Sequence, residues 1–350
     1  MREVELKMNR RLWSILLAAC LVLTGCGKSE TQEIVTKEEA NEKVQIGMSF
    51  DSFVIERWQR DRDVFVSTAK ELGAEVNVQN ANGDAAEQIS QIEYFIEKKM
   101  DVIVIICIDS NLLKDVVQKA KNQGIKVIAY DRMINGANVD LYISFDNEMV
   151  GTMMGEALAS AGLDNKRVVM LCGPMTDNNV SYVDTGFQKV MKDNDIEIVD
   201  SMNADGWKAE LAGNYVYDHY DTIRDVDGIM CGNDSMATQA VRALAEKRLA
   251  GKKIVVGQDA DLEACQRIVE GTQLMTVYKP VEKLAKAAAE YAIKLANEED
   301  LSTLSTIADG DNRVPYVYLE PIAVTRSNID EVIINSGYHL KEDVYLNVRK

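Results

Sequence analysis

The sequence predicts an α/β protein in which two doubly wound parallel-sheet lobes are joined by three hinge crossings. From Val44 onward, short β-rich runs alternate with longer segments of helical period, an alternation that is typical of parallel sheets with right-handed crossovers. The alternation restarts near residue 147, and two runs of about five units each indicate two lobes rather than one very wide sheet. The chain of 350 residues is long enough for two such domains.

The first run begins with a strand and contains three helices. The segment 102–107 (VIVIIC) is apolar throughout, as expected of a strand that is buried on both faces, and Asp109-Ser110 offers an N-cap for the helix after it. The expected strands are 44–50, 74–79, 102–107, 125–130 and 139–144, and the expected helices are 57–72, 85–99 and 110–123.

The second run repeats this pattern, and the tail adds two short strands at 315–319 and 322–325. The expected strands are 167–172, 195–200, 227–231, 253–258 and 273–278, and the expected helices are 147–162, 179–193, 208–222, 234–249, 261–269 and 281–297. Because no Gly/Ser- or Pro-rich linker separates the runs, short hinge segments should connect the lobes. We expect lobe one to comprise 44–146 and 280–322, and lobe two to comprise 147–279 and 323–350.

Residues 1–25 predict a lipoprotein signal peptide. A basic head that ends at Arg10-Arg11 precedes the apolar stretch 12–23, which is too short to span a bilayer. The stretch runs into Leu23-Thr24-Gly25-Cys26, which resembles the bacterial lipobox, in which the cysteine is diacylated and becomes the mature N-terminus. We therefore expect lipidation of Cys26 and a location on the extracytoplasmic face of the cell membrane.

Two alternatives remain at this end of the chain. The leader could be an ordinary signal peptide with a chance cysteine, and translation could start at Met1 or at Met8. The polar segment 26–43 has no hydrophobic period and is expected to be a flexible tether between lipid and folded domain.

Charge and cysteine usage exclude several classes of protein. A formal net charge of −17 argues against nucleic acid as a partner, because its phosphates would repel such a surface. The cysteines beyond position 26 form neither a C-x-x-C pair nor a disulfide framework. We therefore expect them to be free, buried thiols, namely Cys107, Cys172, Cys231 and Cys265.

Polar planar groups and two tryptophans follow the predicted strands of both lobes. The carboxyl ends of parallel strands line the crevice in which open sheets bind ligands. Carboxylate, guanidinium and amide groups suit vicinal hydroxyls, and indoles cover the apolar faces of a pyranose ring. The candidate binding residues are Arg57, Trp58, Asp131, Arg132, Asp177, Asn179, Trp207, Asn233, Asp259 and Lys279.

Each candidate also has an ordinary structural explanation. Asn233 could be only a helix N-cap, the two tryptophans could be core residues, and the arginines could form surface ion pairs. Their coincidence on one predicted rim favours a carbohydrate site.

The sequence argues against an enzyme. His219 and His339 are not spaced as metal ligands, and no P-loop or G-x-S-x-G motif occurs. Asp259 and Asp261 could act as an acid and a base, but they flank a strand-to-helix turn, where one binding and one capping role fits better. The stretch 309–311 lacks the glycine spacing of a calcium loop and is expected to be a surface turn. We expect no catalytic residue, metal or other cofactor.

At these same strand ends the sequence resembles the bacterial periplasmic-type sugar-binding proteins of ABC importers, and among them the D-xylose-binding branch. The resemblance extends from Val44 into the tail. The stretches that carry it are ERWQRDRDVF (56–65), QNANGD (79–84), AYDRMI (129–134), YISFDNE (142–148), DNN (177–179), DGW (205–207), GQDADL (257–262) and GTQLMTVYKP (271–280).

The resemblance implies a type I periplasmic binding protein fold that captures a monosaccharide, D-xylose, and docks on an ABC permease. It implies that Trp58 and Trp207 sandwich the pyranose and that the eight polar candidates hold its hydroxyls. A sensing subunit that presents the sugar to a membrane histidine kinase or chemoreceptor stays an alternative, as does an enzyme of glycoside or sugar-phosphate chemistry.

Overall fold

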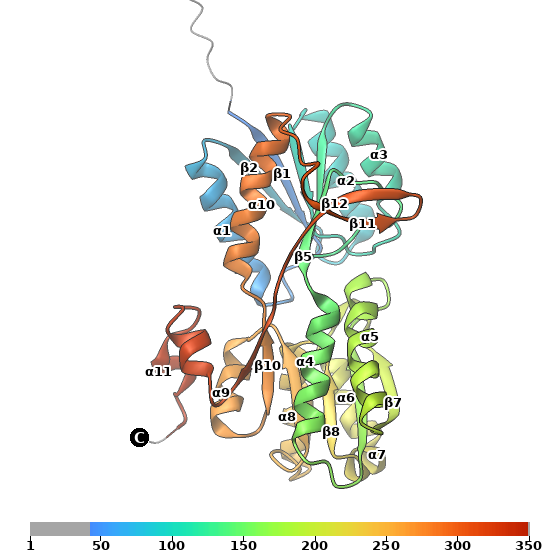
Figure 1. The fold of residues 1–350 in the computed structure, drawn as a ribbon, viewed down its shortest axis with the longest axis vertical. Helices are drawn as coiled ribbons and strands as arrows, with labels where there is room; N and C mark the ends of the chain where they lie inside the picture. Colours follow the sequence, from blue (N-terminus) through green and yellow to red (C-terminus); the bar gives the residue numbers. More distant parts are fainter. Residues whose placement is uncertain (1–42, 349–350) are drawn as a thin grey trace, which may run out of the picture. The chain divides into compact units, whose positions relative to one another are not determined.

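The computed structural model describes residues 43–348, so the predicted signal peptide, Cys26 and nearly all of the tether lie outside the described residues. Within 43–348, two separate sheets each form the centre of a lobe (Figure 1). The predicted fold class is thereby confirmed, with one antiparallel edge strand in each sheet. No helix in this part of the chain is long and apolar enough to cross a membrane.

The sheet of lobe one has the order β11-β12-β5-β4-β3-β1-β2 and is parallel except for β11. Its strands are β1 (Gln45–Phe50), β2 (Glu75–Asn80), β3 (Val102–Ile105), β4 (Lys126–Tyr130), β5 (Leu141–Phe145), β11 (Ser305–Asp309) and β12 (Asn312–Leu319). Its helices are α1 (Arg57–Glu71), α2 (Ala85–Glu97), α3 (Lys114–Lys121) and α10 (Val281–Ala296).

The central strand β3 separates two hydrophobic cores. Val102 and Val104 pack into the core that includes α1 and α10, whereas Ile103 and Ile105 pack into the core that includes α2 and α3. All four side chains are fully buried, which confirms the prediction of a strand buried on both faces.

The sheet of lobe two has the order β13-β10-β9-β8-β6-β7 and is parallel except for β13. Its strands are β6 (Arg167–Cys172), β7 (Glu197–Asn203), β8 (Gly228–Cys231), β9 (Ile254–Gln258), β10 (Met275–Tyr278) and β13 (Ile322–Thr325). Its helices are α4 (Asn147–Ser160), α5 (Asn178–Asp193), η1 (Asp205–Trp207), α6 (Glu210–Asp218), α7 (Tyr220–Asp225), α8 (Asp234–Glu246) and α9 (Leu262–Glu270). The tail adds η2 (Asp330–Ile334) and α11 (Lys341–Val344).

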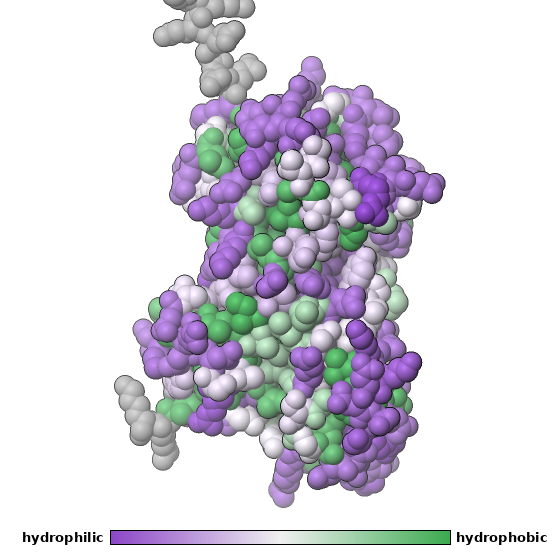
Figure 2. Space-filling model, viewed as in Figure 1, coloured by the Kyte–Doolittle hydropathy of each residue, from purple (hydrophilic) through white to green (hydrophobic). Residues whose placement is uncertain are grey.

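The chain passes between the lobes in three places: after β5, after β10 and after β12. The first and third passages lie side by side, because β5 and β12 are paired up to Phe145 and Leu319, and Asp146 then donates its N–H to Leu319 O at 3.1 Å. Asp146 also caps α4 by accepting from Met149 N at 2.9 Å. On the face seen in Figure 2, hydrophilic residues dominate the outer edges of both lobes.

Two expectations about local structure were wrong, and one strand was not predicted. Helix α3 begins at Lys114 rather than at residue 110, because Ser110 O, which would accept the first helical bond, accepts instead from Asn135 N at 2.7 Å. The predicted helix 208–222 is broken at His219 into α6 and α7. Strand β11 was not predicted, because most of its side chains are exposed at the sheet edge and show no apolar alternation.

The four cysteines of the described chain are free and buried, as predicted. Burial raises the pKa of Cys107 and of Cys172 to about 12. These thiols therefore stay protonated and unreactive at neutral pH.

Helices α4 and α5 meet backbone to backbone at glycines. A Cβ atom added to Gly186 would lie 2.0 Å from Glu148 O, and one added to Gly151 would lie 1.9 Å from Val183 O. Because α5 begins at residues Asn178 and Asn179 of the cleft, this close packing also positions polar side chains between the lobes.

We predict that Gly186→Ala destabilises the protein by about 1–3 kcal/mol, because the added methyl group forces the two helices apart. Chemical denaturation followed by circular dichroism measures the loss. Glu156→Ala, at an exposed position of α4, serves as the control. Equal unfolding midpoints for both variants would contradict the prediction.

Candidate functional site

The ten candidate residues predicted from the strand ends all line one cavity between the lobes. The cavity lies at the carboxyl ends of both sheets, next to the point in each sheet where the strand order reverses. The other lining residues are Ile55, Asn147, Cys172, Gly173, Val180, Val183, Met230, Gly232 and Gln258.

The two indoles enter the cavity from opposite lobes. Trp58 lies in the first turn of α1, is 1% exposed and packs edge-on against Phe50 of β1. Trp207 ends η1 and is 8% exposed. The backbone at Gly206 and Trp207 has φ of 59° and 57°, which turns the indole toward β6. There the ring lies so close to Gly173 that a Cβ atom at this position would be 2.3 Å from it.

On the lobe-one side, Arg57 forms the centre of a buried ion cluster. Its guanidinium contacts Asp61 through Nε and Nη2 at 3.2 and 3.1 Å, and Asp131 through Nη2 at 2.9 Å. Burial would raise the pKa of Asp131, but Arg57, Lys279 and Arg132 together lower it below its ordinary value. Asp131 is therefore a carboxylate acceptor at neutral pH.

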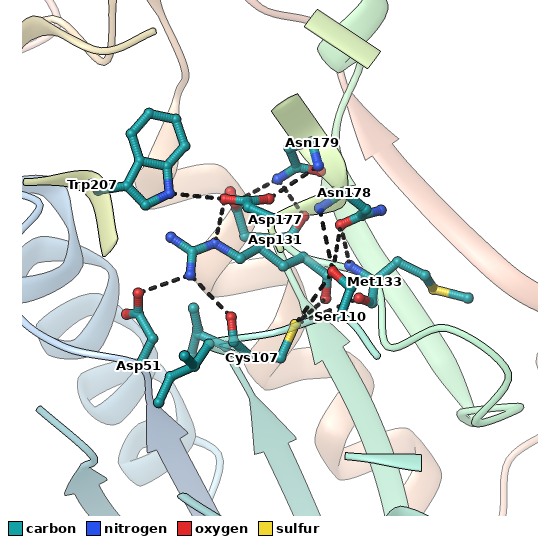
Figure 3. A network of polar contacts seen from close by, with 12 residues as sticks. Asp51, Cys107, Ser110, Asp131, Met133, Asp177, Asn178, Asn179 and Trp207 are labelled. Carbon is teal, nitrogen blue, oxygen red and sulfur yellow. Dashed lines mark hydrogen bonds and ion pairs between the residues drawn. The ribbon is translucent and has the colours of Figure 1, made fainter. Parts of the chain in front are cut away.

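A second network joins the two lobes through Arg132 (Figure 3). Arg132 Nη1 contacts Asp51 Oδ2 at 2.8 Å and Cys107 O at 2.9 Å, within lobe one. Arg132 Nε lies 2.7 Å from Asp177 Oδ2 of lobe two. The same carboxylate oxygen accepts from Trp207 Nε1 at 3.2 Å, so the ion pair fixes one of the two indoles.

Asn178 and Asn179, at the start of α5, add further contacts across the cleft. Asn179 Nδ2 donates to the backbone and side-chain oxygens of Asp131, each at 3.0 Å. Asn178 Oδ1 accepts from Met133 N at 3.1 Å, and Asn178 N donates to Ser110 Oγ at 3.2 Å. The lobes are thus in direct polar contact around the cavity.

On the lobe-two side, Asp259 and Lys279 form an ion pair at 2.9 Å, and Arg57 Nη1 approaches Asp259 Oδ1 to 3.9 Å. Asn233 has the capping role considered above, because its Oδ1 accepts from Met236 N at 2.9 Å. Its Nδ2 stays available to the cavity, so the cap and the site are compatible in one side chain.

Three buried polar atoms of cavity-lining residues have no hydrogen-bond partner among residues 43–348: Trp58 Nε1, Asn233 Nδ2 and Gln258 Oε1. Arg132 Nε and Asp259 Oδ1 also lack a hydrogen bond of good geometry, but each belongs to an ion pair. Buried donors and acceptors are costly to leave unpaired. These two donors and one acceptor belong to residues that line the same cavity, and a ligand with hydroxyl groups has the chemistry to pair with them.

Sequence reasoning missed Gln258 and Asn147, the two further polar lining residues. Gln258 is the last residue of β9, directly before Asp259, and was counted as part of the strand. The rule that strand ends carry the site would have found it if the final strand residue had been included. The partners behind the site, Asp51 and Asp61, were also missed.

Comparison with known proteins agrees with this geometry. Residues 46–300 match the family model described as "Periplasmic binding protein domain". The chain is 42% identical to the D-xylose-binding periplasmic protein of Haemophilus influenzae, over 86% of this chain and 92% of that protein. It is 41% identical to the D-xylose-binding periplasmic protein of Escherichia coli, over 93% of this chain and 98% of that protein.

Among solved structures, an ABC transporter solute-binding protein from Clostridium phytofermentans with bound β-D-glucose superimposes with a TM-score of 0.76 at 27% identity, covering 86% of this chain and 99% of that one. The relatives are named as binding proteins, which confirms the prediction of a binding protein rather than an enzyme. The resemblance drawn from the strand ends is likewise confirmed, and the chain belongs to the periplasmic binding protein family.

Proposed function

We propose that this protein is an extracytoplasmic solute-binding lipoprotein that captures D-xylose between its lobes and delivers the sugar to an ABC permease. The observation that carries the proposal is the cavity itself, which receives one indole from each lobe and is lined by residues that hold three unpartnered polar atoms. The 41–42% identity to two D-xylose-binding periplasmic proteins supports the choice of sugar.

The proposed contacts follow from the chemistry of the lining. Trp58 and Trp207 cover the two apolar faces of the pyranose. Its hydroxyls donate to the carboxylates and accept from the guanidinium, ammonium and amide groups. In addition to the ten predicted residues, we assign a contact to Gln258, whose Oε1 is a buried acceptor.

The charges of the cavity favour a neutral sugar. The lining contains three cations, Arg57, Arg132 and Lys279, and three carboxylates that pair with them, namely Asp131, Asp177 and Asp259. Asp51 and Asp61 add negative charge directly behind the two arginines. An anionic sugar, such as a sugar phosphate or a uronate, would meet excess negative charge.

Capture is proposed to work by lobe closure without any bond being made or broken. Lobe one, 44–146 and 280–322, and lobe two, 147–279 and 323–350, would rotate about the three crossings. A sugar that contacts both lobes stabilises the arrangement in which Arg132 reaches Asp177, and so shifts the population toward it.

We predict that Trp58→Ala and Trp207→Ala each weaken D-xylose binding about ten- to a hundredfold, because stacking and burial of one sugar face contribute about 1–3 kcal/mol. Calorimetric titration with D-xylose, D-ribose and D-glucose measures affinity and selectivity, and melting curves of the sugar-free variants report on the fold. Unchanged affinity with a large drop in melting temperature would identify the tryptophans as core residues only. Tighter binding of D-glucose than of D-xylose would overturn the assignment of the sugar.

We predict that Gly173→Ala acts like Trp207→Ala, because the new methyl group would occupy the space of the indole. The D-xylose affinity should fall about tenfold or more, and the indole resonance of Trp207 should shift in nuclear magnetic resonance spectra. Gly213→Ala, on α6 and outside the cavity lining, is the matched control. If Gly173→Ala binds D-xylose as tightly as the control, Trp207 is not positioned by this glycine.

The lipid anchor is predicted from Leu23-Thr24-Gly25-Cys26 alone. Cys26→Ala should release the protein from the membrane fraction or block its processing, because the diacylated thiol is the attachment to the bilayer. Cys20→Ala, within the leader, should leave the protein on the membrane. Mass spectrometry that finds an intact, unmodified Cys26 in the native host would disprove the anchor.

A further inference from the structure

The carboxylate of Asp259 is presented to the cavity by a strained turn. Asp259 and Ala260 have φ of 96° and 54°, a region that residues with a side chain rarely occupy. Such conformations persist only where the surrounding structure holds them, and they cluster at functional sites. What holds this turn therefore bears directly on the ion pair of Asp259 with Lys279.

The N–H groups of the turn are held from within lobe two. Asp259 N donates to Val277 O at 2.8 Å, and Ala260 N donates to Thr276 Oγ1 at 3.1 Å, so both are fixed by strand β10. These bonds restrain one side of the turn only. Within lobe two, the weak thiol donor of Cys265 in α9 reaches Ala260 O at 3.6 Å. The other partners of the two carbonyl groups come from another part of the chain.

The carbonyl groups are held by the C-terminal tail, about 80 residues later in the sequence. His339 Nε2 lies 2.8 Å from Ala260 O, and Tyr338 Oη donates to Asp259 O at 3.4 Å. Because a carbonyl oxygen only accepts, His339 must carry its proton on Nε2. Burial lowers the pKa of His339, which favours this neutral form.

The tail segment is itself fixed from both lobes. The ring of Tyr338 is 5% exposed and packs edge-on against Tyr278 of β10 with the ring centroids 4.8 Å apart. From lobe one, Arg60 of α1 donates through Nη2 to Tyr338 O at 2.8 Å, and its guanidinium lies 4.2 Å from the ring centroid. Arg60 also pairs with Glu282 of α10 at 2.8 Å. The segment thus has little freedom to move away from the turn.

From these contacts we infer that Tyr338 and His339 are positioning residues for ligand binding. They hold the strained turn at Asp259 and Ala260 so that the carboxylate of Asp259 faces Lys279 and the ligand. Neither residue lines the cavity, so they act through Asp259 and not by touching the sugar. The inference rests on the proposed function as far as the ligand is concerned, whereas the restraint on the turn is independent of it.

The test uses the full chain with His339→Leu, which removes the donor, and His339→Gln, whose amide nitrogen restores a donor near the position of Nε2. Tyr345→Phe is the matched control, because Tyr345 is also in the tail and donates to Asp330 at 2.7 Å, away from the turn. We expect His339→Leu to raise the Kd for D-xylose about three- to tenfold, as for one lost hydrogen bond. His339→Gln should recover most of the affinity, and the control should match the wild type.

Two further measurements separate positioning from general stability. In an Asp259→Ala background, His339→Leu should have no additional effect on the Kd, because the positioned carboxylate is gone. Hydrogen exchange of the segment 257–262 should be faster in His339→Leu than in the control, with or without sugar. An equal loss of affinity in the Asp259→Ala background, or unchanged exchange, overturns the inference. If the wild type binds no sugar, the proposed function fails, and the exchange experiment still decides whether the tail restrains the turn.

Discussion

The buried ion pair between Arg132 and Asp177 is the contact on which the arrangement of the site depends. A charge removed from water must be paired and hydrogen-bonded, and removal of one partner leaves the other uncompensated. Arg132 meets this requirement with Asp51 and a backbone carbonyl in lobe one and with Asp177 in lobe two. Asp177 also accepts from Trp207. The same carboxylate therefore fixes both the contact between the lobes and the position of one indole.

In the closure that we propose, the hinge would make this contact reversible without loosening the lobes themselves. Two of the three crossings run side by side where β5 and β12 are paired, so the lobes can rotate about a short, hydrogen-bonded segment. Each lobe keeps its own buried strands, as β3 shows with two valines in one core and two isoleucines in the other. In that closure, the polar residues at the strand ends would approach or separate while the two sheets stay intact.

The cavity lining could be predicted from sequence because parallel strands end on one edge of each sheet, so Asp131 had to lie on the rim of lobe one and Asp259 on the rim of lobe two. Gln258 was not predicted as a site residue because it is the last residue of β9 and fits the pattern of that strand. The start of α3 was misplaced because Ser110 O accepts from Asn135 N, a contact between distant parts of the chain. The hydrogen bond from His339 to Ala260 O also joins distant parts of the chain. The local sequence pattern does not indicate which carbonyl group a residue of the tail will contact.

In the cavity, the charged groups pair with one another and the unpaired hydrogen-bonding atoms are neutral. This arrangement explains how a site with so many charges can favour a neutral ligand. Each cation forms an ion pair with a carboxylate, so the charged groups hold one another in place. The buried atoms that lack a hydrogen-bond partner are instead an indole N–H, an amide N–H and an amide oxygen. A neutral polyol can satisfy these atoms and use the spare lone pairs of the carboxylates without breaking an ion pair. Such preorganisation lowers the cost of ordering the site on binding, and the tail would contribute to it in the way that we infer for Tyr338 and His339.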